Sequence, residues 1–322
     1  MAGRMRASVV LGSGGARGYA HIGALQVLGE RGIEVAAIAG TSMGALVGGV
    51  AAAGGLDEYT DWALSLTQRE VFRLLDFTLS APGGAIRAER IIAKVGDILG
   101  DLAIEDLPIP YTAVATDLAA RREVWFQRGP VVHAIRASIA IPGVITPIVI
   151  NGRTLVDGGL LNPLPIEPTA AVSADVTVAV SLSGARARTG QATPVKETSE
   201  ARPLEEWTSR LRRSTAEVLE SERLRALANR FAVGHRKDEA AEDPDAAEWV
   251  LGTADIGTLD LLNMSFETMS ALISRYRMAS NPPDILVTVP SNAVSTLDFH
   301  RAAEMIELGR SLTIAALDRA GY

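Results

Sequence analysis

The sequence predicts an α/β fold, a three-layer α/β/α sandwich with a mainly parallel central sheet. Two strand–turn–helix units open the chain between residues 7 and 53, and further short apolar runs typical of strands recur along it. Strand–helix–strand order favours parallel strands, because the chain must cross back over the sheet before the next strand begins. Helices then cover both faces of such a sheet, so we expect its strands to be buried.

The first unit begins with a predicted strand at residues 7–11. A glycine-rich loop follows at 12–18, and Gly32 stands where the next helix should end. The helix between them is predicted by apolar residues that recur on one face, namely Ile22, Leu25 and Leu28.

The second unit is a strand at 35–39, a tight turn, and a helix of small residues at 45–53. Residues 35–56 carry no charge and are long enough to span a membrane. Polar and glycine residues at 40–44 interrupt the run, however, and Ala and Gly make up most of it. We therefore favour a buried strand, a turn and a buried helix.

The middle of the chain predicts two pairs of strands. Residues 111–115 and 123–126 are strand-like runs joined by a polar turn. Residues 147–150 and 153–156 flank an Asn-Gly pair, which is a strong signal for a two-residue hairpin.

The remaining elements complete the predicted sheet and its cover. Residues 57–99 predict helices, 175–182 and 285–289 predict strands, and 299–317 predict a closing helix with an apolar face.

Between residues 184 and 255 the composition changes. A polar, loop-like segment at 186–202 precedes an amphipathic helix at 204–231 and an acidic run at 237–248. We expect an elaboration on a single domain that spans residues 1–322. Two interpretations stay open for it, a surface helix with a solvated charge run or a lid that faces a membrane.

Composition excludes several classes of protein. The chain has 322 residues, 48% of them apolar, so it can bury a large core. A net charge of -7 argues against nucleic acid as the main partner, and the lack of cysteine excludes disulfides and thiolate metal sites. The first arginines lead straight into a strand without a signal-peptide core, so we expect a cytoplasmic protein, with peripheral contact at the inner face of the membrane as an option.

The turn at residues 40–44 carries the most informative motif. Gly40-Thr41-Ser42-Met43-Gly44 is a Gly-x-Ser-x-Gly sequence between a strand and a helix, which is the context of a nucleophile elbow. Gly40 and Gly44 are needed because a Cβ there would collide with the neighbouring strand and helix. We therefore predict that Ser42 is a nucleophile with an exposed Oγ.

The glycine-rich loop at 12–18 can supply an oxyanion hole. Its backbone N–H groups open a helix and share the positive end of the helix dipole, and Arg17 adds positive charge. A dinucleotide site is the competing interpretation. Arg17 or Ser13 breaks the Gly-x-Gly-x-x-Gly pattern in either register, and no acidic residue ends the second strand. A purely structural glycine turn is a third option.

The base for Ser42 has two candidates. Asp157 followed by His300 satisfies the chain order of an α/β-hydrolase triad, although too few strands precede Ser42 for that fold. A carboxylate alone can also serve, and Asp157-Gly158-Gly159 directly follows the predicted hairpin. An ordinary Asp-Gly turn also stays open. The histidines of the chain are His21, His133, His235 and His300.

Taken together, these motifs resemble the patatin-like phospholipase family in its bacterial type. The resemblance is carried, in the family's order, by Gly14-Gly15-Ala16-Arg17-Gly18, Gly40-Thr41-Ser42-Met43-Gly44 and Asp157-Gly158-Gly159. Further similar segments are 115–117, 136–138 with Ile141-Pro142, and 299–303.

The resemblance implies a patatin-like fold and a Ser–Asp dyad that needs no histidine. Ser42 would be the nucleophile and Asp157 the base. Gly14, Gly15, Arg17 and Gly18 would belong to the oxyanion loop. Ser13 stands where the family usually has glycine, which leaves the N–H groups of residues 14 and 15 in place.

The expected function is therefore a serine lipid-acyl hydrolase of the phospholipase A or lysophospholipase type. It would act on a lipid or acyl-ester substrate without cofactor or metal, with peripheral membrane contact as an option and no nucleic acid. Two alternatives stay open, a non-catalytic lipid-binding or regulatory protein on the same fold and a soluble short-chain carboxylesterase.

Overall fold

The computed structural model describes residues 4–75, 84–187 and 258–322. They belong to one compact unit, which comprises residues 1–189 and 256–322. The predicted elaboration at 184–255 falls almost entirely outside the described residues. It therefore stays a prediction, as does the single-domain organisation.

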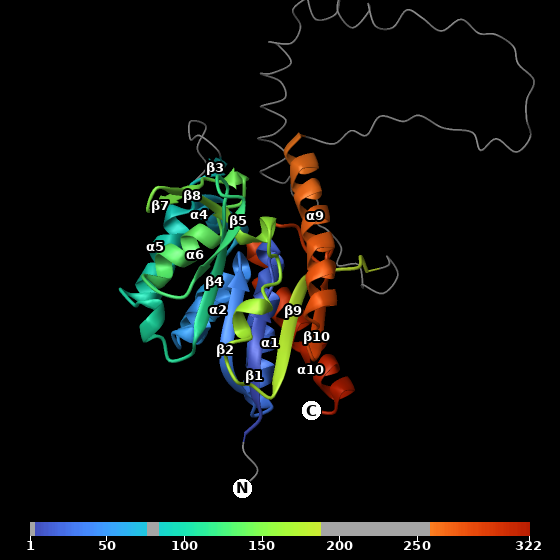
Figure 1. Ribbon diagram of the computed structural model, residues 1–322. Coiled ribbons are helices and arrows are strands. Elements are labelled where there is room, and N and C mark those ends of the chain that lie inside the picture. Colours follow the sequence, from blue (N-terminus) through green and yellow to red (C-terminus); the bar gives the residue numbers. More distant parts are fainter. Residues whose placement is uncertain (1–3, 76–83, 188–257) are drawn as a thin grey trace, which may run out of the picture. The chain divides into compact units, whose positions relative to one another are not determined.

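The central sheet is parallel across five neighbouring strands (Figure 1). β1 (Arg6–Leu11) pairs with β2 (Glu34–Thr41) on one side and with β9 (Val176–Gly184) on the other. β10 (Ile285–Pro290) continues the sheet beyond β9, and β4 (Tyr111–Asp117) continues it beyond β2. All residues of β4 are buried, as expected for a strand covered on both faces. The predicted α/β sheet is confirmed.

Antiparallel strands extend the sheet beyond β4. β5 (Arg122–Phe126) and β8 (Arg153–Asp157) both pair antiparallel with β4, and β7 (Ile148–Ile150) pairs with β8. Asn151 and Gly152 join β7 to β8 with φ values of 51° and 74°. Two successive positive φ values are typical of a type I′ turn, so the predicted hairpin is confirmed.

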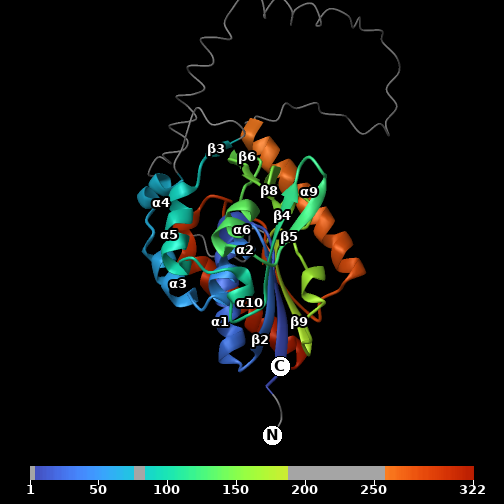
Figure 2. The same ribbon diagram turned by 60° about the vertical axis from the view of Figure 1, so that its left-hand side comes forward.

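Helices cover the two faces of the sheet unequally. Figure 2 shows most helices on one side of the sheet and α9 (Thr258–Ser280) on the other. The 3₁₀ helices η3 (Gly158–Leu160) and η4 (Glu167–Thr169) contact α9 and β2, respectively. The helices of the fuller layer are α1 (Ala20–Glu30), α2 (Met43–Ala52), α3 (Leu56–Ser65), α4 (Gln68–Leu74), α5 (Glu89–Leu99), α6 (Val131–Ser138) and α10 (Ala302–Ala320).

The alternation of side chains along β1 divides the core between these layers. Val9 and Leu11 belong to the large hydrophobic core on the side of the fuller helical layer. Val10 points the other way and packs with Leu164, and Met278 of α9 covers that small cluster. The three-layer α/β/α fold is therefore confirmed, with a large hydrophobic cluster on one face of the sheet and a small one on the other.

Two regions differ in detail from the sequence prediction. The segment predicted as helices at 57–99 holds a short strand between α4 and α5, β3 (Gly84–Ile86), which pairs with β6 (Gly143–Ile145). α9 was not predicted, and many of its large apolar residues face solvent although Met278 packs against the core. The uncharged segment 35–56 forms β2 and α2 as expected, and none of the helices in the described ranges has the length and apolarity to cross a membrane.

Candidate active site

β4 brings Ser42 and Asp157 together. Its first half, up to Val114, pairs with β2, whereas its second half, from Ala115, pairs with β8, which runs the opposite way. β5 pairs along both halves and so occupies the other edge of β4. β2 and β8 therefore lie end to end along one edge. Ser42 follows the last residue of β2, and Asp157 is the last residue of β8, so the two side chains emerge where the strands meet.

The Ser42 turn has a strained backbone. Ser42 has φ 58° and ψ −125°, which residues other than glycine rarely adopt. A Cβ on Gly40 would overlap the carbonyl of Gly44, and a Cβ on Gly44 would overlap the carbonyl of Leu11. Ser42 directly precedes α2, so its hydroxyl lies at the positive end of that helix dipole. The predicted strand–turn–helix context is confirmed. The predicted exposure is wrong, since Ser42 is only 3% exposed.

Ser138, at the end of α6, stabilises this turn through hydrogen bonds. Its hydroxyl accepts a hydrogen bond from the Ser42 N–H at 2.8 Å and donates one to the Val114 carbonyl at 2.6 Å. The side chain is fully buried. One hydroxyl therefore ties the elbow to β4, the strand along which the two ends meet. The sequence analysis included Ser138 in the resemblance but assigned it no role.

The Asp157 carboxyl is fully buried beside the Ser42 hydroxyl. Its Oδ1 accepts the Gly159 N–H at 2.7 Å. Oδ2 has no partner of regular hydrogen-bond geometry within the described part of the chain. Burial raises the pKa of Asp157 to about 7, and hydrogen bonding from Ser42 and Gly159 lowers it only in part. A carboxyl that titrates near neutral pH beside a serine hydroxyl suits proton transfer.

The glycine-rich loop presents two backbone donors at the start of η1 (Gly15–Tyr19). The Ser13 N–H donates to Pro163 O at 2.8 Å, and the Ala16 N–H donates to Thr296 O at 2.9 Å. The Gly14 and Gly15 N–H groups between them have no acceptor among the described residues. Gly15 lines the same groove as Ser42. The two N–H groups are therefore free to donate to an anion, and their role as an oxyanion hole for Ser42 stays a prediction.

The other two residues predicted for this loop contact protein groups. Gly18 lies inside η1, directly against the side chain of Met43. The Arg17 guanidinium donates to Gly14 O and Ser291 O and forms an ion pair with Glu267 at 2.7 Å. Its charge is thus shared with a carboxylate and its side chain is buried. We expect Arg17 to hold the loop in shape, and a direct role toward substrate stays a prediction.

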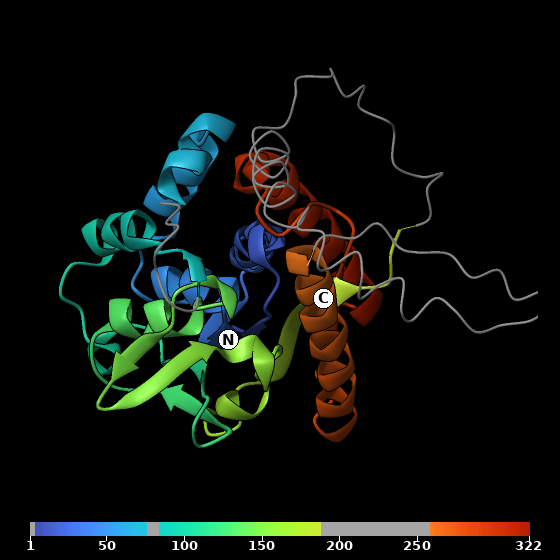
Figure 3. The same cartoon turned by 90° about the horizontal axis from the view of Figure 1, so that it is seen from above.

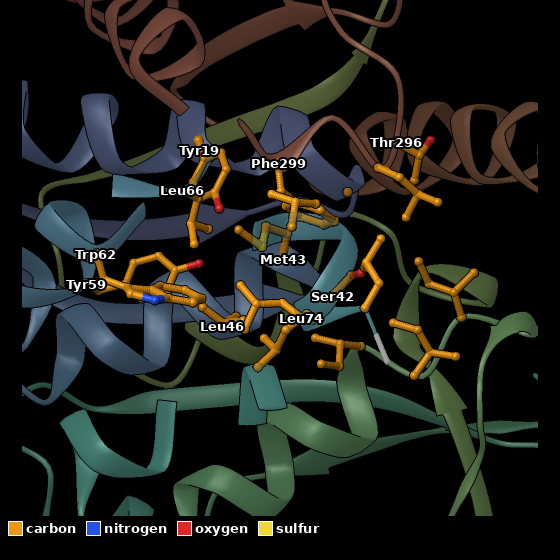
Figure 4. A pocket seen from close by; sticks show the side chains of 18 residues that line it. Tyr19, Ser42, Met43, Leu46, Tyr59, Trp62, Leu66, Leu74, Thr296 and Phe299 are labelled. Carbon is orange, nitrogen blue, oxygen red and sulfur yellow. The ribbon is translucent and has the colours of Figure 1, made fainter. Parts of the chain in front are cut away.

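An apolar groove opens at Ser42. Most of its walls are aliphatic and aromatic side chains. Figure 4 shows Ser42 at one side of the groove, Tyr59 and Trp62 at the opposite side, and Met43, Leu46 and Leu74 between them. Such a shape suits a long apolar group whose polar end lies at the serine. Sequence reasoning missed these residues, because apolar side chains on α3 and α4 look like ordinary core positions.

The histidines play other parts. None of the residues that line the groove is a histidine. His21 is fully buried in α1, and its Nε2 lies 2.8 Å from the Gly12 carbonyl. Burial lowers its pKa to about 4, so His21 is neutral at pH 7 and ties α1 to the start of the glycine loop. Among the described residues, no group of His, Asp and Glu is arranged to hold a metal ion.

α9 contacts both sides of the site through polar side chains. Ser270 donates to Gly159 O at 2.9 Å and Arg277 donates to Leu161 O at 3.1 Å, on the loop that follows Asp157. Glu267 binds Arg17 of the glycine loop and accepts from the Thr296 hydroxyl at 3.1 Å. Sequence reasoning did not find this helix or its tethers.

Comparisons with known proteins agree with this architecture. The family model described as patatin-like phospholipase matches residues 9–170. An uncharacterized NTE family protein of Mycobacterium tuberculosis is 46% identical over 97% of this chain and 91% of that protein. The patatin-like phospholipase domain-containing protein 7 of Rattus norvegicus is 34% identical over 54% of this chain and 13% of its own. Among solved structures, VipD from Legionella pneumophila matches with a TM-score of 0.44 and 14% identity, over 98% of this chain and 67% of that chain.

Proposed function

The chain belongs to the patatin-like phospholipase family, and we propose that it hydrolyses acyl esters of lipids with a Ser42–Asp157 dyad. Family membership supports a lipid ester hydrolase. The observation that carries the dyad is the end-to-end meeting of β2 and β8 along β4, which brings a serine hydroxyl beside a buried carboxyl.

The reaction begins with proton transfer. Asp157 accepts the Ser42 proton while Oγ attacks the ester carbonyl carbon. The carbonyl oxygen becomes an oxyanion that accepts hydrogen bonds from the Gly14 and Gly15 N–H groups. The ester C–O bond then breaks, and the alcohol or lysolipid leaves with the proton from Asp157. The acyl group remains on Ser42.

Water completes the cycle. Asp157 takes a proton from a water molecule, whose oxygen attacks the acyl-enzyme carbonyl. The second oxyanion uses the same two N–H groups. When it collapses, the fatty acid leaves and Ser42 regains its proton from Asp157.

The groove favours a long acyl chain as the substrate group. Its walls offer apolar contact from Ser42 as far as Trp62. Burying one methylene is worth about 0.8 kcal/mol, which corresponds to about fourfold in kcat/KM. A series of p-nitrophenyl esters should therefore show kcat/KM rising with chain length until the groove is full. A soluble short-chain carboxylesterase would instead prefer acetate or butyrate esters.

A fluorophosphonate probe tests both the nucleophile and the alternative of a non-catalytic lipid-binding protein. The wild-type chain should be labelled and should hydrolyse p-nitrophenyl esters, whereas Ser42→Ala should do neither. Ser65→Ala, which removes an exposed serine hydroxyl on α3, is the matched control and should behave as wild type. An unlabelled wild-type chain that still binds lipid would favour a non-catalytic lipid-binding protein. Full activity in Ser42→Ala would refute the dyad.

A further inference from the structure

α9 is amphipathic in the reverse of the usual sense. Several of its polar side chains face the protein, where Ser270, Ser274 and Arg277 are buried or partly buried. Large apolar side chains occupy the opposite side and face solvent. A surface helix of a globular protein normally turns its apolar side to the core, so this orientation needs an explanation.

The exposed apolar residues form a continuous stripe. Leu262, Met269 and Tyr276 are spaced at intervals of seven, so they lie on one side of the helix. Their exposed fractions are 58%, 52% and 69%. Leu261 and Leu272 flank them at 53% and 50%. We call these five residues the α9 stripe.

None of the five stripe residues is charged, although the exposed Arg275 borders the stripe and α9 carries further charges on its other sides. Soluble proteins rarely leave a contiguous apolar patch in water unless something covers it. Uncharged apolar residues cannot form ion pairs, so they do not favour a partner that is recognised through its charges.

α9, which carries the stripe on its outer side, contacts the proposed active site with its inner side. α9 runs back along the sheet toward β10, so its first turns lie near the carboxyl ends of the parallel strands, where Ser42 emerges (Figure 1). Glu267, on the inner side of α9, binds the Thr296 hydroxyl, and Thr296 lines the groove. Figure 3 shows α9 at the periphery of the described elements, on the side of the sheet away from α1.

We propose that the α9 stripe docks on a lipid surface and so sets the mouth of the groove against the phase that contains the substrate. This inference rests on the proposed function, because a substrate that resides in a membrane or micelle supplies the apolar partner. Apolar helical faces of this kind insert at the boundary between headgroups and acyl chains. The contact is apolar rather than electrostatic, because the stripe carries no cations and the chain has a net charge of -7.

Vesicle binding tests the proposal directly. The full chain with Ser42→Ala, which removes turnover, is sedimented with phosphatidylcholine vesicles in low and high salt. We expect binding that persists in high salt. Adding Leu261→Gln and Leu272→Gln should weaken it at least about tenfold, since two buried leucines are lost from the contact. Leu64→Gln with Leu102→Gln, two exposed leucines outside α9, is the matched control and should bind like the parent.

Two results would overturn the proposal. One is vesicle binding that is absent, or that is equal in the stripe variant and the parent. The other is light scattering in which the parent is a dimer and the stripe variant a monomer, which would make the stripe a contact between copies of the chain.

Hydrolysis of soluble p-nitrophenyl butyrate separates this proposal from the proposed function. With Ser42 intact, the stripe variant and the control should both keep the parent rate within about twofold, because the stripe does not touch the dyad. Soluble-ester hydrolysis without vesicle binding would refute the stripe alone. Vesicle binding without hydrolysis or Ser42 labelling would refute the dyad alone.

Discussion

The Ser42 turn and the Asp157 loop, which we call the two halves of the site, are stabilised by different interactions. The Ser42 half is fixed by backbone geometry, with β1, β2 and α2 packed so closely that Gly40 and Gly44 have no room for a Cβ. The Asp157 half follows a short antiparallel strand, and polar side chains of α9 tether the loop behind it. The nucleophile is therefore positioned by steric fit together with one long-range hydrogen bond to Ser138, whereas the loop behind the base depends on hydrogen bonds from α9.

The buried titratable groups of the two halves also differ. Burial raises the pKa of Asp157 to about 7 and lowers that of His21 to about 4. Both shifts favour the neutral form, but they act on stability in opposite directions as pH changes.

Asp157→Asn should abolish most activity and stabilise the protein above pH 7. Loss of the base should lower kcat by about a thousandfold or more. The folded-state pKa of Asp157 lies above the ordinary value of 3.8, so the stabilisation from the neutral carboxyl is fully present below pH 3.8 and is lost as pH rises through 7. At pH 8 the buried carboxylate destabilises the wild type by up to about 4 kcal/mol. Urea unfolding at pH 5 and pH 8 should show the variant gaining stability at both pH values, with the larger gain at pH 8. An equal gain at both pH values would contradict the assigned pKa.

The pH profile of the wild type should report the same group. Asp157 must be ionised to accept the Ser42 proton, so kcat/KM on a soluble ester should fall about tenfold per unit below pH 7. The measurement is a profile from pH 5 to pH 9, with enzyme stability checked at each pH. A flat profile between pH 5 and pH 8 would exclude Asp157 as the base.

Ser138→Ala should damage the Ser42 half without touching substrate. The Ser42 N–H and the Val114 carbonyl would both lose a buried partner, which costs about 1–3 kcal/mol in stability. We expect kcat to fall about 10- to 100-fold with little change in KM, because the elbow shifts relative to β4. Ser138→Thr keeps the hydroxyl and should recover part of the activity. If Ser138→Ala lowered stability alone, Ser138 would be structural only.

Arg277→Met should loosen the Asp157 half. Arg277 donates to Leu161 O and forms ion pairs with Glu123 and Glu167, and all three ionised side chains are partly buried. We expect a loss of about 1–3 kcal/mol and a decrease of only a few-fold in kcat, since the dyad itself is untouched. Arg275→Met, an exposed residue of the same helix, is the control and should change neither quantity. A loss of activity as large as that of Asp157→Asn would mean that Arg277 contributes to the chemistry.

His21 should affect stability in acid and leave activity at pH 7 unchanged. Its pKa falls from 6.5 to about 4 on folding, so its contribution is present above pH 6.5 and is lost as pH falls through 4. This group should account for about 3 kcal/mol of lost stability between pH 7 and pH 4. Urea unfolding across that range, compared between the wild type and His21→Asn, should give a shallower slope for the variant. Parallel slopes would mean that His21 does not carry the effect.

Much of the Ser42 half could be predicted from the sequence because its signals are local. The Gly-x-Ser-x-Gly turn, the glycine loop and the Asn-Gly hairpin all require backbone conformations that only a few residue types allow. The pairing of Ser42 with Asp157 is different. It came from a family resemblance, and residues alone left a histidine or an ordinary turn open.

The alternation of strands and helices, and the turns that need glycine, depend on neighbouring residues and can therefore be predicted from the sequence. Three other features depend on tertiary contacts. β2 and β8 meet along β4, Ser138 forms a hydrogen bond with Ser42 from 96 residues away, and α9 directs several polar side chains toward the protein. Such contacts join distant parts of the chain. They depend on the order in which the strands pair in the sheet, and the residue pattern within one segment does not specify that order.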